Sequence, residues 1–548
     1  MAAASSHILP LPSAAASRSK VPKSPLFPSS LPLSPSVHAQ TSSSRHHSRI
    51  RASSGGKDAS NTPPSSSAMK AITKDVEMEQ QREDRRVEMA QAKDKEDARE
   101  RERRWQESHQ PRDNLAPRWR EVAGRDNWVG MLDPFDPLLR AELIRYGEFA
   151  QACYDAFDFD PYSRYCGGCK YSRRSFFQSL DMANAGYEVT RYLYATSNVK
   201  LPNFSRRSKR NNAWSDSANW IGYIAVSDDA TTVLLGRRDI VVCWRGTVTQ
   251  LEFIADMVNF NQPIYAEGIP TPDRSVKVAA GFVNLYTDKD TNCRFSKYSA
   301  RDQLLAEVRR QVLRYAEERG EEVSISITGH SLGGALATLS AYDLAEVGLN
   351  RVRPGGGEER VVPVTVYSFA GPRLGNEPFK ERFEEILGLK SLRVVNVHDA
   401  VPKVPGLIIN ENVPEFVRRA GAAMPWSYCH VGVKLALDHK RSPFLKDTAE
   451  ASCFHNLEAY LHLLDGHHGT ERSFALTTGR DPALVNKACD FLKEEYMVPP
   501  NWRQDANRGM ARNADGRWTQ PERTKFDDYP ADIEYYLNQI ERAINNRA

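Results

Sequence analysis

An amphipathic helix is the first clear element of the folded part of the chain, and its pattern begins after Asp136. Apolar residues recur at alternating steps of four and three, at Leu139, Leu143, Tyr146, Ala150, Cys153 and Phe157. This spacing places them on one face of an α-helix. Asp136 is a favourable N-cap, and Pro137 suits the first helical position, where a backbone N–H has no partner to lose. The pattern therefore predicts a helix that begins at residue 137.

Runs rich in Ile, Val and aromatic residues predict β-strands over residues 220–227 and 239–247. A third strand is expected over residues 323–328, followed by a glycine-bearing turn and a helix from about Leu332. Residues 363–376 and 392–405 are each expected to form a strand that runs into a loop. Strands that alternate with helices predict an α/β fold, with a mostly parallel sheet and helices on both of its faces.

The first 57 residues differ from the rest because they contain no Asp or Glu and are rich in Ser, Ala and Pro. Such a segment cannot bury a core, and its composition is typical of organelle import leaders. We expect a chloroplast transit peptide over residues 1–51, with a mature start near Ala52. A mitochondrial leader and an untargeted tail remain alternatives. Residues 52–116 are dense in mixed charge, which favours a solvated, disordered or helical linker over a coiled coil.

Composition and charge exclude several classes of protein. The 548 residues carry 74 basic and 70 acidic side chains, a formal net charge of +4, which does not suggest a nucleic-acid binder. The most apolar stretch, residues 326–345, contains His330 and Asp343, so no transmembrane helix is predicted. The eight cysteines are too sparse for a disulfide-stapled fold. Cys166 and Cys169 lack a second pair at metal-ligand spacing, which favours a packing role over a zinc site.

The run GHSLGG contains the strongest candidate for chemistry. Gly329, Ser331 and Gly333 lie where an apolar strand meets an Ala- and Leu-rich helix. In that context G-x-S-x-G predicts a sharp turn that presents a nucleophilic serine above the edge of the sheet. Glycines allow the strained turn and a close approach of strand and helix. The helix N-terminus would stabilise an oxyanion, with the backbone N–H of Leu332 as its first donor.

A serine nucleophile needs a histidine base and a carboxylate that orients it, and in this fold they follow in the order Ser, acid, His. Asp399 is the preferred acid because it directly follows an apolar strand and precedes the loop VPKVP. Asp343 should point away from Ser331, and Asp438 and Asp465 are expected in polar turns. His455 is the preferred base because it is expected to start a helix. Among the other downstream histidines, His398 and His462 are expected to face away from the site. His430 is expected to be a buried structural residue, and the remaining three are expected to be solvated, namely His439, His467 and His468.

Four segments together resemble the class 3 lipases, the fungal-lipase-like branch of the α/β-hydrolases. These are GHSLGG, CWRGT, HDAVPKVPG and FHNLEAYLH. Further segments, among them YCGGCKYSRRSFF and LVNKACDFLKEEYMVP, are similar to plant phospholipases A1 of the chloroplastic Igamma group. The likeness covers residues 117–548, which it implies form one α/β-hydrolase lipase domain. It also implies Ser331, Asp399 and His455 as the catalytic triad and Thr247 as the second oxyanion contributor, after Leu332.

This resemblance implies release of the sn-1 fatty acid from phospholipids at a membrane surface, with galactolipids and triacylglycerol as further substrates. The reaction requires no metal and no cofactor. Two alternatives remain open: a lipase-like signalling scaffold that does not need its triad, and a galactolipid or neutral-lipid lipase with little phospholipase activity. A basic loop could contact anionic membrane, although an ordinary solvated loop is the favoured interpretation. The loop comprises Arg206, Arg207, Lys209 and Arg210, beside Phe204 and Trp214.

Overall fold

The computed structural model describes residues 115–196, 208–209, 213–215, 217–247, 261–405, 427–504, 506–523 and 533–545. All of them lie in one compact unit, Arg85–Ala548. The predicted transit peptide, 1–51, and nearly all of the predicted linker, 52–116, lie outside the described residues. Helix α2 (Leu115–Val122) crosses the expected domain boundary at 117 and buries Leu115, Trp119 and Val122. Within the described ranges, none of the helices combines the length and apolar character needed to cross a membrane.

A seven-stranded sheet forms the centre of this unit, with the strand order β1-β2-β3-β6-β9-β10-β11. The five strands from β3 to β11 are parallel, and β2 is antiparallel to both of its neighbours. The strands are β1 (Tyr187–Thr196), β2 (Ala218–Ser227), β3 (Arg238–Trp244), β6 (Val323–His330), β9 (Val364–Phe369), β10 (Lys390–Asn396) and β11 (Val433–Leu437). This arrangement confirms the predicted mostly parallel sheet.

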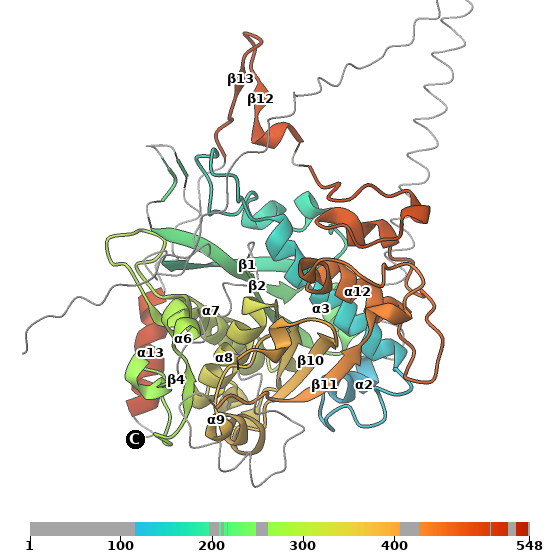
Figure 1. Ribbon diagram of the computed structural model, residues 1–548. Coiled ribbons are helices and arrows are strands. Elements are labelled where there is room, and N and C mark those ends of the chain that lie inside the picture. Colours follow the sequence, from blue (N-terminus) through green and yellow to red (C-terminus); the bar gives the residue numbers. More distant parts are fainter. Residues whose placement is uncertain are drawn as a thin grey trace, which may run out of the picture. The chain divides into compact units, whose positions relative to one another are not determined.

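Helices cover both faces of the sheet, and two separate apolar clusters fill the two interfaces (Figure 1). Helices α2, α3 and α12 contribute to the first cluster, and α6, α7, α8, α9 and α13 contribute to the second. Their bounds are α3 (Pro137–Asp155), α12 (Leu457–Gly466), α6 (Ala280–Thr287), α7 (Ala300–Val312), α8 (Leu332–Val347), α9 (Glu377–Glu381) and α13 (Ile533–Asn545). A sheet buried on both faces explains why its strands are almost continuously apolar.

Helix α3 confirms the predicted amphipathic pattern. The Asp136 side chain caps it by accepting hydrogen bonds from the backbone N–H groups of Leu138 and Leu139, and Pro137 is its first residue. The predicted apolar face is buried, although Phe157 lies beyond the end of the helix. The strand predicted over 239–247 is too long, because β3 ends at Trp244. Beyond it the chain packs closely at Gly246, where a Cβ would lie 2.0 Å from the Tyr154 hydroxyl.

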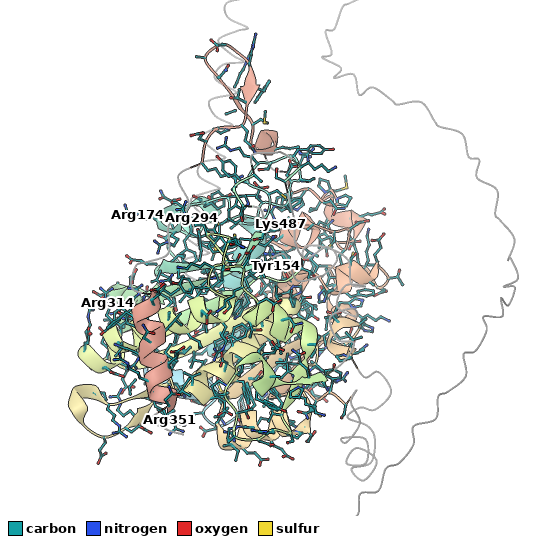
Figure 2. The ribbon with its side chains drawn as sticks, turned by 90° about the vertical axis from the view of Figure 1, so that its left-hand side faces the viewer. Tyr154, Arg174, Arg294, Arg314, Arg351 and Lys487 are labelled. Atoms are coloured by element: carbon teal, nitrogen blue, oxygen red, sulfur yellow. The ribbon has the colours of Figure 1, made fainter. Side chains whose placement is uncertain are left out.

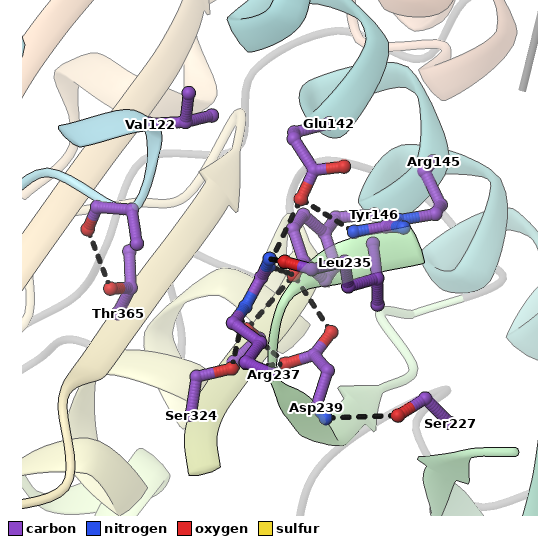
Figure 3. A network of polar contacts seen from close by, with 12 residues as sticks. Val122, Glu142, Arg145, Tyr146, Ser227, Leu235, Arg237, Asp239, Ser324 and Thr365 are labelled. Carbon is purple, nitrogen blue, oxygen red and sulfur yellow. Dashed lines mark hydrogen bonds and ion pairs between the residues drawn. The ribbon is translucent and has the colours of Figure 1, made fainter. Parts of the chain in front are cut away.

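A buried polar network fastens α3 to the sheet on the side of the first cluster (Figure 3). The Arg237 guanidinium lies 3.1 Å from the Glu142 carboxylate of α3 and donates to Ser324 of β6 at 2.9 Å. The Asp239 carboxylate of β3 accepts four hydrogen bonds of 2.7–2.8 Å, from Tyr146, Tyr187, Ser324 and Ser326. Glu142 is therefore paired with Arg237, and the buried Asp239 carboxylate is satisfied by hydrogen bonds, as burial requires.

Replacing Asp239 with Asn is expected to lower the free energy of unfolding at pH 7 by about 3 kcal/mol, because hydrogen bonds to a buried charged group contribute on that scale. Burial raises the pKa of the Asp239 carboxyl, but Arg237 and Arg145 outweigh it and hold that pKa below its ordinary value. A lowered pKa contributes stability that is fully present above the unfolded-state pKa, about 3.9 for Asp. That contribution is lost as the pH falls through the folded-state pKa.

Urea unfolding of wild type and Asp239→Asn at several pH values measures this effect. The difference in free energy should be constant between neutral pH and about pH 5 and should shrink below about pH 4. Asp229→Asn is the matched control, because Asp229 pairs with Arg238 but its side chain is 87% exposed, so little change is expected. A difference that grows on acidification would contradict the assignment.

Candidate active site

Ser331 occupies a strained turn between β6 and α8. Its backbone has φ 59° and ψ −125°, a conformation that is unfavourable for a residue with a Cβ and that commonly marks functional sites. The Ser331 N–H donates to the carbonyl of Phe369 on β9 at 2.9 Å, which holds the turn against the sheet. The Ser331 side chain is buried, and its Oγ has no hydrogen-bond partner among the described residues. Leu332 follows as the first residue of α8.

The glycines of GHSLGG permit two close backbone approaches. A Cβ on Gly329 would lie 2.3 Å from the backbone of Gly333, so strand and helix can meet here only without a side chain. A Cβ on Gly333 would lie 2.3 Å from the carbonyl oxygen of Trp244, at the end of β3. The glycines thus bring the start of α8 against the carboxyl ends of β6 and β3.

His455 and Asp399 form a tight pair, although they are 56 residues apart in the chain. The distance from His455 Nδ1 to Asp399 Oδ2 is 2.6 Å, and the Asp399 side chain is fully buried. Because a carboxylate only accepts, Nδ1 carries a proton, and in the neutral imidazole Nε2 therefore keeps its lone pair. Nε2 is buried, and within the described ranges it has no hydrogen-bond partner. His455 does not start α12 as expected, since it lies between α11 (Ala451–Phe454) and Asn456, the N-cap of α12.

Two further donors fix the Asp399 carboxylate. The Tyr460 hydroxyl on α12 donates to Oδ2 at 2.7 Å, and the backbone N–H of Val401 donates to Oδ1 at 2.9 Å. Burial, together with Asp399, raises the pKa of Tyr460 well above its ordinary value, so this phenol remains a donor. Tyr460 was not predicted from the sequence, and its place one turn into the helix after His455 is the only signal that pointed to it.

His330, the residue before Ser331, supports His455. Its Nε2 lies 2.9 Å from the His455 carbonyl oxygen, and its Nδ1 lies 2.7 Å from the hydroxyl of Tyr154 on α3. Burial and the nearby His455 hold the pKa of His330 well below its ordinary value, so the ring is neutral. Nε2–H therefore donates to the carbonyl, and Tyr154 donates to Nδ1. The centroids of the His330 and His455 rings are 4.6 Å apart. Through its hydrogen bond to the His455 carbonyl, His330 is a positioning residue, and the sequence did not predict this role.

A cavity of about 730 Å³ opens beside these residues, and its size suits a large organic ligand. His330, His455 and Thr247 are among the residues that line it, together with Tyr154 and Lys487, which Figure 2 labels. Thr247 lies three residues beyond the end of β3. The structure thus brings Thr247 and His455 to one cavity, next to the Ser331 turn. Among the described residues, no hydrogen bond joins Ser331 Oγ to His455 Nε2, as is common for catalytic pairs without substrate.

Two residues that were not chosen for the catalytic triad, His439 and Asp465, differ in burial or position from the prediction. His439, expected to be solvated, is fully buried and stacks on Phe454 with ring centroids 4.7 Å apart. It lies two residues after the end of β11, and its ring contacts Phe454 and Phe491 in the first apolar cluster. Asp465, expected in a polar turn, lies in α12, where its buried carboxylate accepts the backbone N–H groups of Thr477 and Thr478. Neither residue contacts Ser331 or His455.

The expected basic membrane loop lies largely outside the described residues. Of its members, Lys209 lies over the ring of Tyr162, with 5.0 Å from Nζ to the ring centroid. Trp214 is partly buried, packs on Phe295 and donates to the carbonyl of Cys166 at 2.8 Å. Trp214 is therefore a packing residue rather than a free membrane anchor. Cys166 and Cys169 are both buried, and Cys169 Sγ lies 3.5 Å from the Tyr192 hydroxyl.

Comparison with known proteins gives consistent matches. Residues 241–408 match the family described as lipase (class 3). The chain is 60% identical over 429 residues to "Phospholipase A1-Igamma1, chloroplastic" of Arabidopsis thaliana, which covers 78% of this chain and 82% of that relative. It is 57% identical over 428 residues to "Phospholipase A1-Igamma2, chloroplastic" of the same plant, covering 78% and 80%. A solved lipase from Rhizopus microsporus var. chinensis has 22% identity, covers 56% of this chain and 76% of its own, and superposes with a TM-score of 0.32.

Proposed function

The chain belongs to the class 3 lipase family, and from this membership we propose that it is a chloroplastic phospholipase A1, a carboxylic ester hydrolase that releases the sn-1 fatty acid of glycerophospholipids. The observation that carries the mechanism is the His455–Asp399 pair. Its unpartnered Nε2 and the unpartnered Oγ of Ser331 belong to neighbouring turns beside one cavity. A neutral imidazole with a free Nε2 is the form that a general base requires.

The proposed reaction begins when Ser331 Oγ attacks the carbonyl carbon of the sn-1 ester and transfers its proton to His455 Nε2. Asp399 stabilises the resulting imidazolium without taking its proton. The oxyanion accepts hydrogen bonds from the Leu332 N–H and from Thr247. Collapse of this intermediate breaks the bond to the glycerol oxygen, which takes the proton from Nε2. Water, deprotonated by His455, then attacks the acyl ester and releases the fatty acid and Ser331.

A phosphatidylcholine with different acyl chains at sn-1 and sn-2 tests the proposed function with the full chain. Release of the sn-1 fatty acid, together with a lysophospholipid that retains the sn-2 chain, is the expected result. Monogalactosyl- and digalactosyl-diacylglycerol and triolein serve as parallel substrates. Hydrolysis of these lipids alone would indicate a galactolipid or neutral-lipid lipase. No hydrolysis of any of them would indicate a scaffold whose triad is dispensable.

Replacing Thr247 with Val is expected to lower kcat by about 100- to 1000-fold, because one oxyanion donor contributes on that scale. Val has nearly the shape of Thr and lacks only the hydroxyl, so KM should change much less than kcat. Steady-state kinetics on the same phospholipid measure both constants. Thr247→Ser, which keeps the hydroxyl, is the matched control and should retain most of the activity. Equal losses in the two variants would point to packing instead of oxyanion stabilisation.

A further inference from the structure

We propose that His398, Asp438 and His439 form a binding site for a zinc ion, separate from the proposed catalytic residues. His398 lies in the turn after β10, and Asp438 and His439 directly follow β11, the neighbouring strand. One ring nitrogen of each histidine and one carboxylate oxygen of Asp438 all lie within 4.8 Å of one another. Two parallel strands therefore deliver three metal-ligating side chains to one point at the carboxyl edge of the sheet.

His439 provides the observation that points to a ligand. The residue is fully buried, with 0% of its surface exposed, and its Nδ1 has no hydrogen-bond partner in the part of the chain that the structure describes. Its Nε2 lies 3.3 Å from the carbonyl oxygen of Asp447. A carbonyl only accepts, so Nε2 carries the proton and Nδ1 presents a bare lone pair. Metal-ligating histidines characteristically donate their second ring N–H to a backbone carbonyl, which fixes the tautomer in this way.

The other two ligands are held at suitable distances. His398 Nε2 and Asp438 Oδ1 are 3.0 Å apart. Tetrahedral zinc with bonds of about 2.0–2.1 Å separates its donors by roughly 3.3 Å, so these two donors need only a small adjustment. The backbone N–H of Lys440 donates to Asp438 Oδ1 at 3.0 Å, which orients the carboxylate, as outer-shell donors do at metal sites.

The donor set selects the ion. Two imidazole nitrogens and one carboxylate oxygen suit zinc, whereas calcium and magnesium prefer ligand sets made of oxygen. The His398 and Asp438 side chains are 32% and 37% exposed, so an ion can enter from solvent and water can complete its coordination. His439 closes the site from the interior. The chemistry is that of a three-ligand zinc site with one open position.

Zinc at this position would tie together the segments that carry the proposed acid and base. His398 directly precedes Asp399, and His439 stacks on Phe454, which directly precedes His455. The ion would thus link the end of β10, the end of β11 and, through Phe454, the turn before α12. Because zinc binds the assembled site and not the separated ligands of the unfolded chain, it should raise the melting temperature. This expectation holds whether or not the chain is a phospholipase.

Zinc titration of the metal-depleted full chain against a chromophoric zinc indicator tests the site. One zinc ion per chain should bind to the wild type beyond what His439→Gln binds, because all other histidines are present in both. His398→Gln and Asp438→Asn should weaken this ion by about 100-fold or more, since changes even at outer-shell partners cost 10- to 100-fold. These two partly exposed positions keep the test valid if His439→Gln fails to fold. Cobalt should give visible ligand-field absorption in the wild type that all three variants lack.

Melting curves with and without added zinc provide the second readout. The wild type should melt at a higher temperature with zinc, and the three variants should show little or no rise. His430→Gln is the matched control, because it removes one imidazole whose Nε2 contacts the carbonyl of Pro402 away from the cluster, and it should behave like the wild type. Equal stoichiometry and affinity in the wild type and the cluster variants, or no binding by the wild type at micromolar zinc, would overturn the proposal.

Discussion

Replacing Ser331 with Ala is expected to lower kcat for phospholipid hydrolysis by about 10⁶-fold, the scale seen when a triad nucleophile is removed. Without Oγ no acyl-enzyme can form, and only oxyanion stabilisation and substrate binding remain. Product release is measured by mass spectrometry over long incubations, so that a small residual rate is still detected. Substrate affinity should change little, because the oxyanion donors and the cavity are retained.

Ser452→Ala is the matched control for this experiment. Ser452 also lines the cavity, but its hydroxyl lies 3.4 Å from the Glu450 carboxylate and has no role in the proposed reaction. It should keep nearly full activity. Melting temperatures of both variants separate loss of chemistry from loss of fold. Unchanged product release by Ser331→Ala would rule out Ser331 as the nucleophile, although the family membership would still stand.

Replacing Asp399 with Asn is expected to lower kcat by about 10⁴-fold, the scale found when a triad aspartate becomes an amide. Asp399 accepts hydrogen bonds from His455 Nδ1, Tyr460 and Val401. All three neighbours are donors, so the side chain at position 399 must act only as an acceptor. An Asn side chain would turn its NH₂ toward one of these donors. If it faces Nδ1, the imidazole proton moves to Nε2, and the ring can no longer accept the proton of Ser331.

Kinetics of Asp399→Asn and Tyr460→Phe show whether Asp399 acts by fixing the tautomer of His455 or only by packing. Tyr460→Phe removes one donor and leaves the carboxylate, so its loss of kcat should be much smaller than that of Asp399→Asn. Asp490→Asn is the control, because its carboxylate is 53% exposed and pairs with Lys446 outside the proposed site. If Asp399→Asn retained wild-type kcat, another carboxylate would have to orient His455.

The class 3 lipase fold and its central sheet were predictable because their signals are local. Strand and helix periodicity around GHSLGG depends on residues that are neighbours in the chain, and β6, α8 and β9 formed where the pattern predicted them. The ends of elements were less accurate. β3 ends before Thr247, where Gly246 packs against Tyr154 of α3. α12 begins after His455, because the Asn456 side chain caps the helix and also donates to the carbonyl of Val485.

The burial of individual polar residues was the least predictable feature. His439 and Asp465 stand among polar neighbours in the sequence, yet both are buried in the structure. Their partners, Phe454 for His439 and the backbone N–H groups of Thr477 and Thr478 for Asp465, are 12 to 15 residues away in the chain. Local composition cannot report such contacts, because they exist only after the elements pack.

The sequence by itself determined the nature of this protein: an α/β lipase with a candidate nucleophile at Ser331 and preferred partners at Asp399 and His455. Order along the chain and the ends of predicted strands were sufficient for those choices. Only the tertiary structure decided which groups meet. In the folded protein His455 contacts Asp399, and His330 contacts both the His455 carbonyl and Tyr154. The side chains of His398, Asp438 and His439 lie close together. The physical reason is that a parallel sheet aligns the carboxyl ends of strands that lie far apart in sequence.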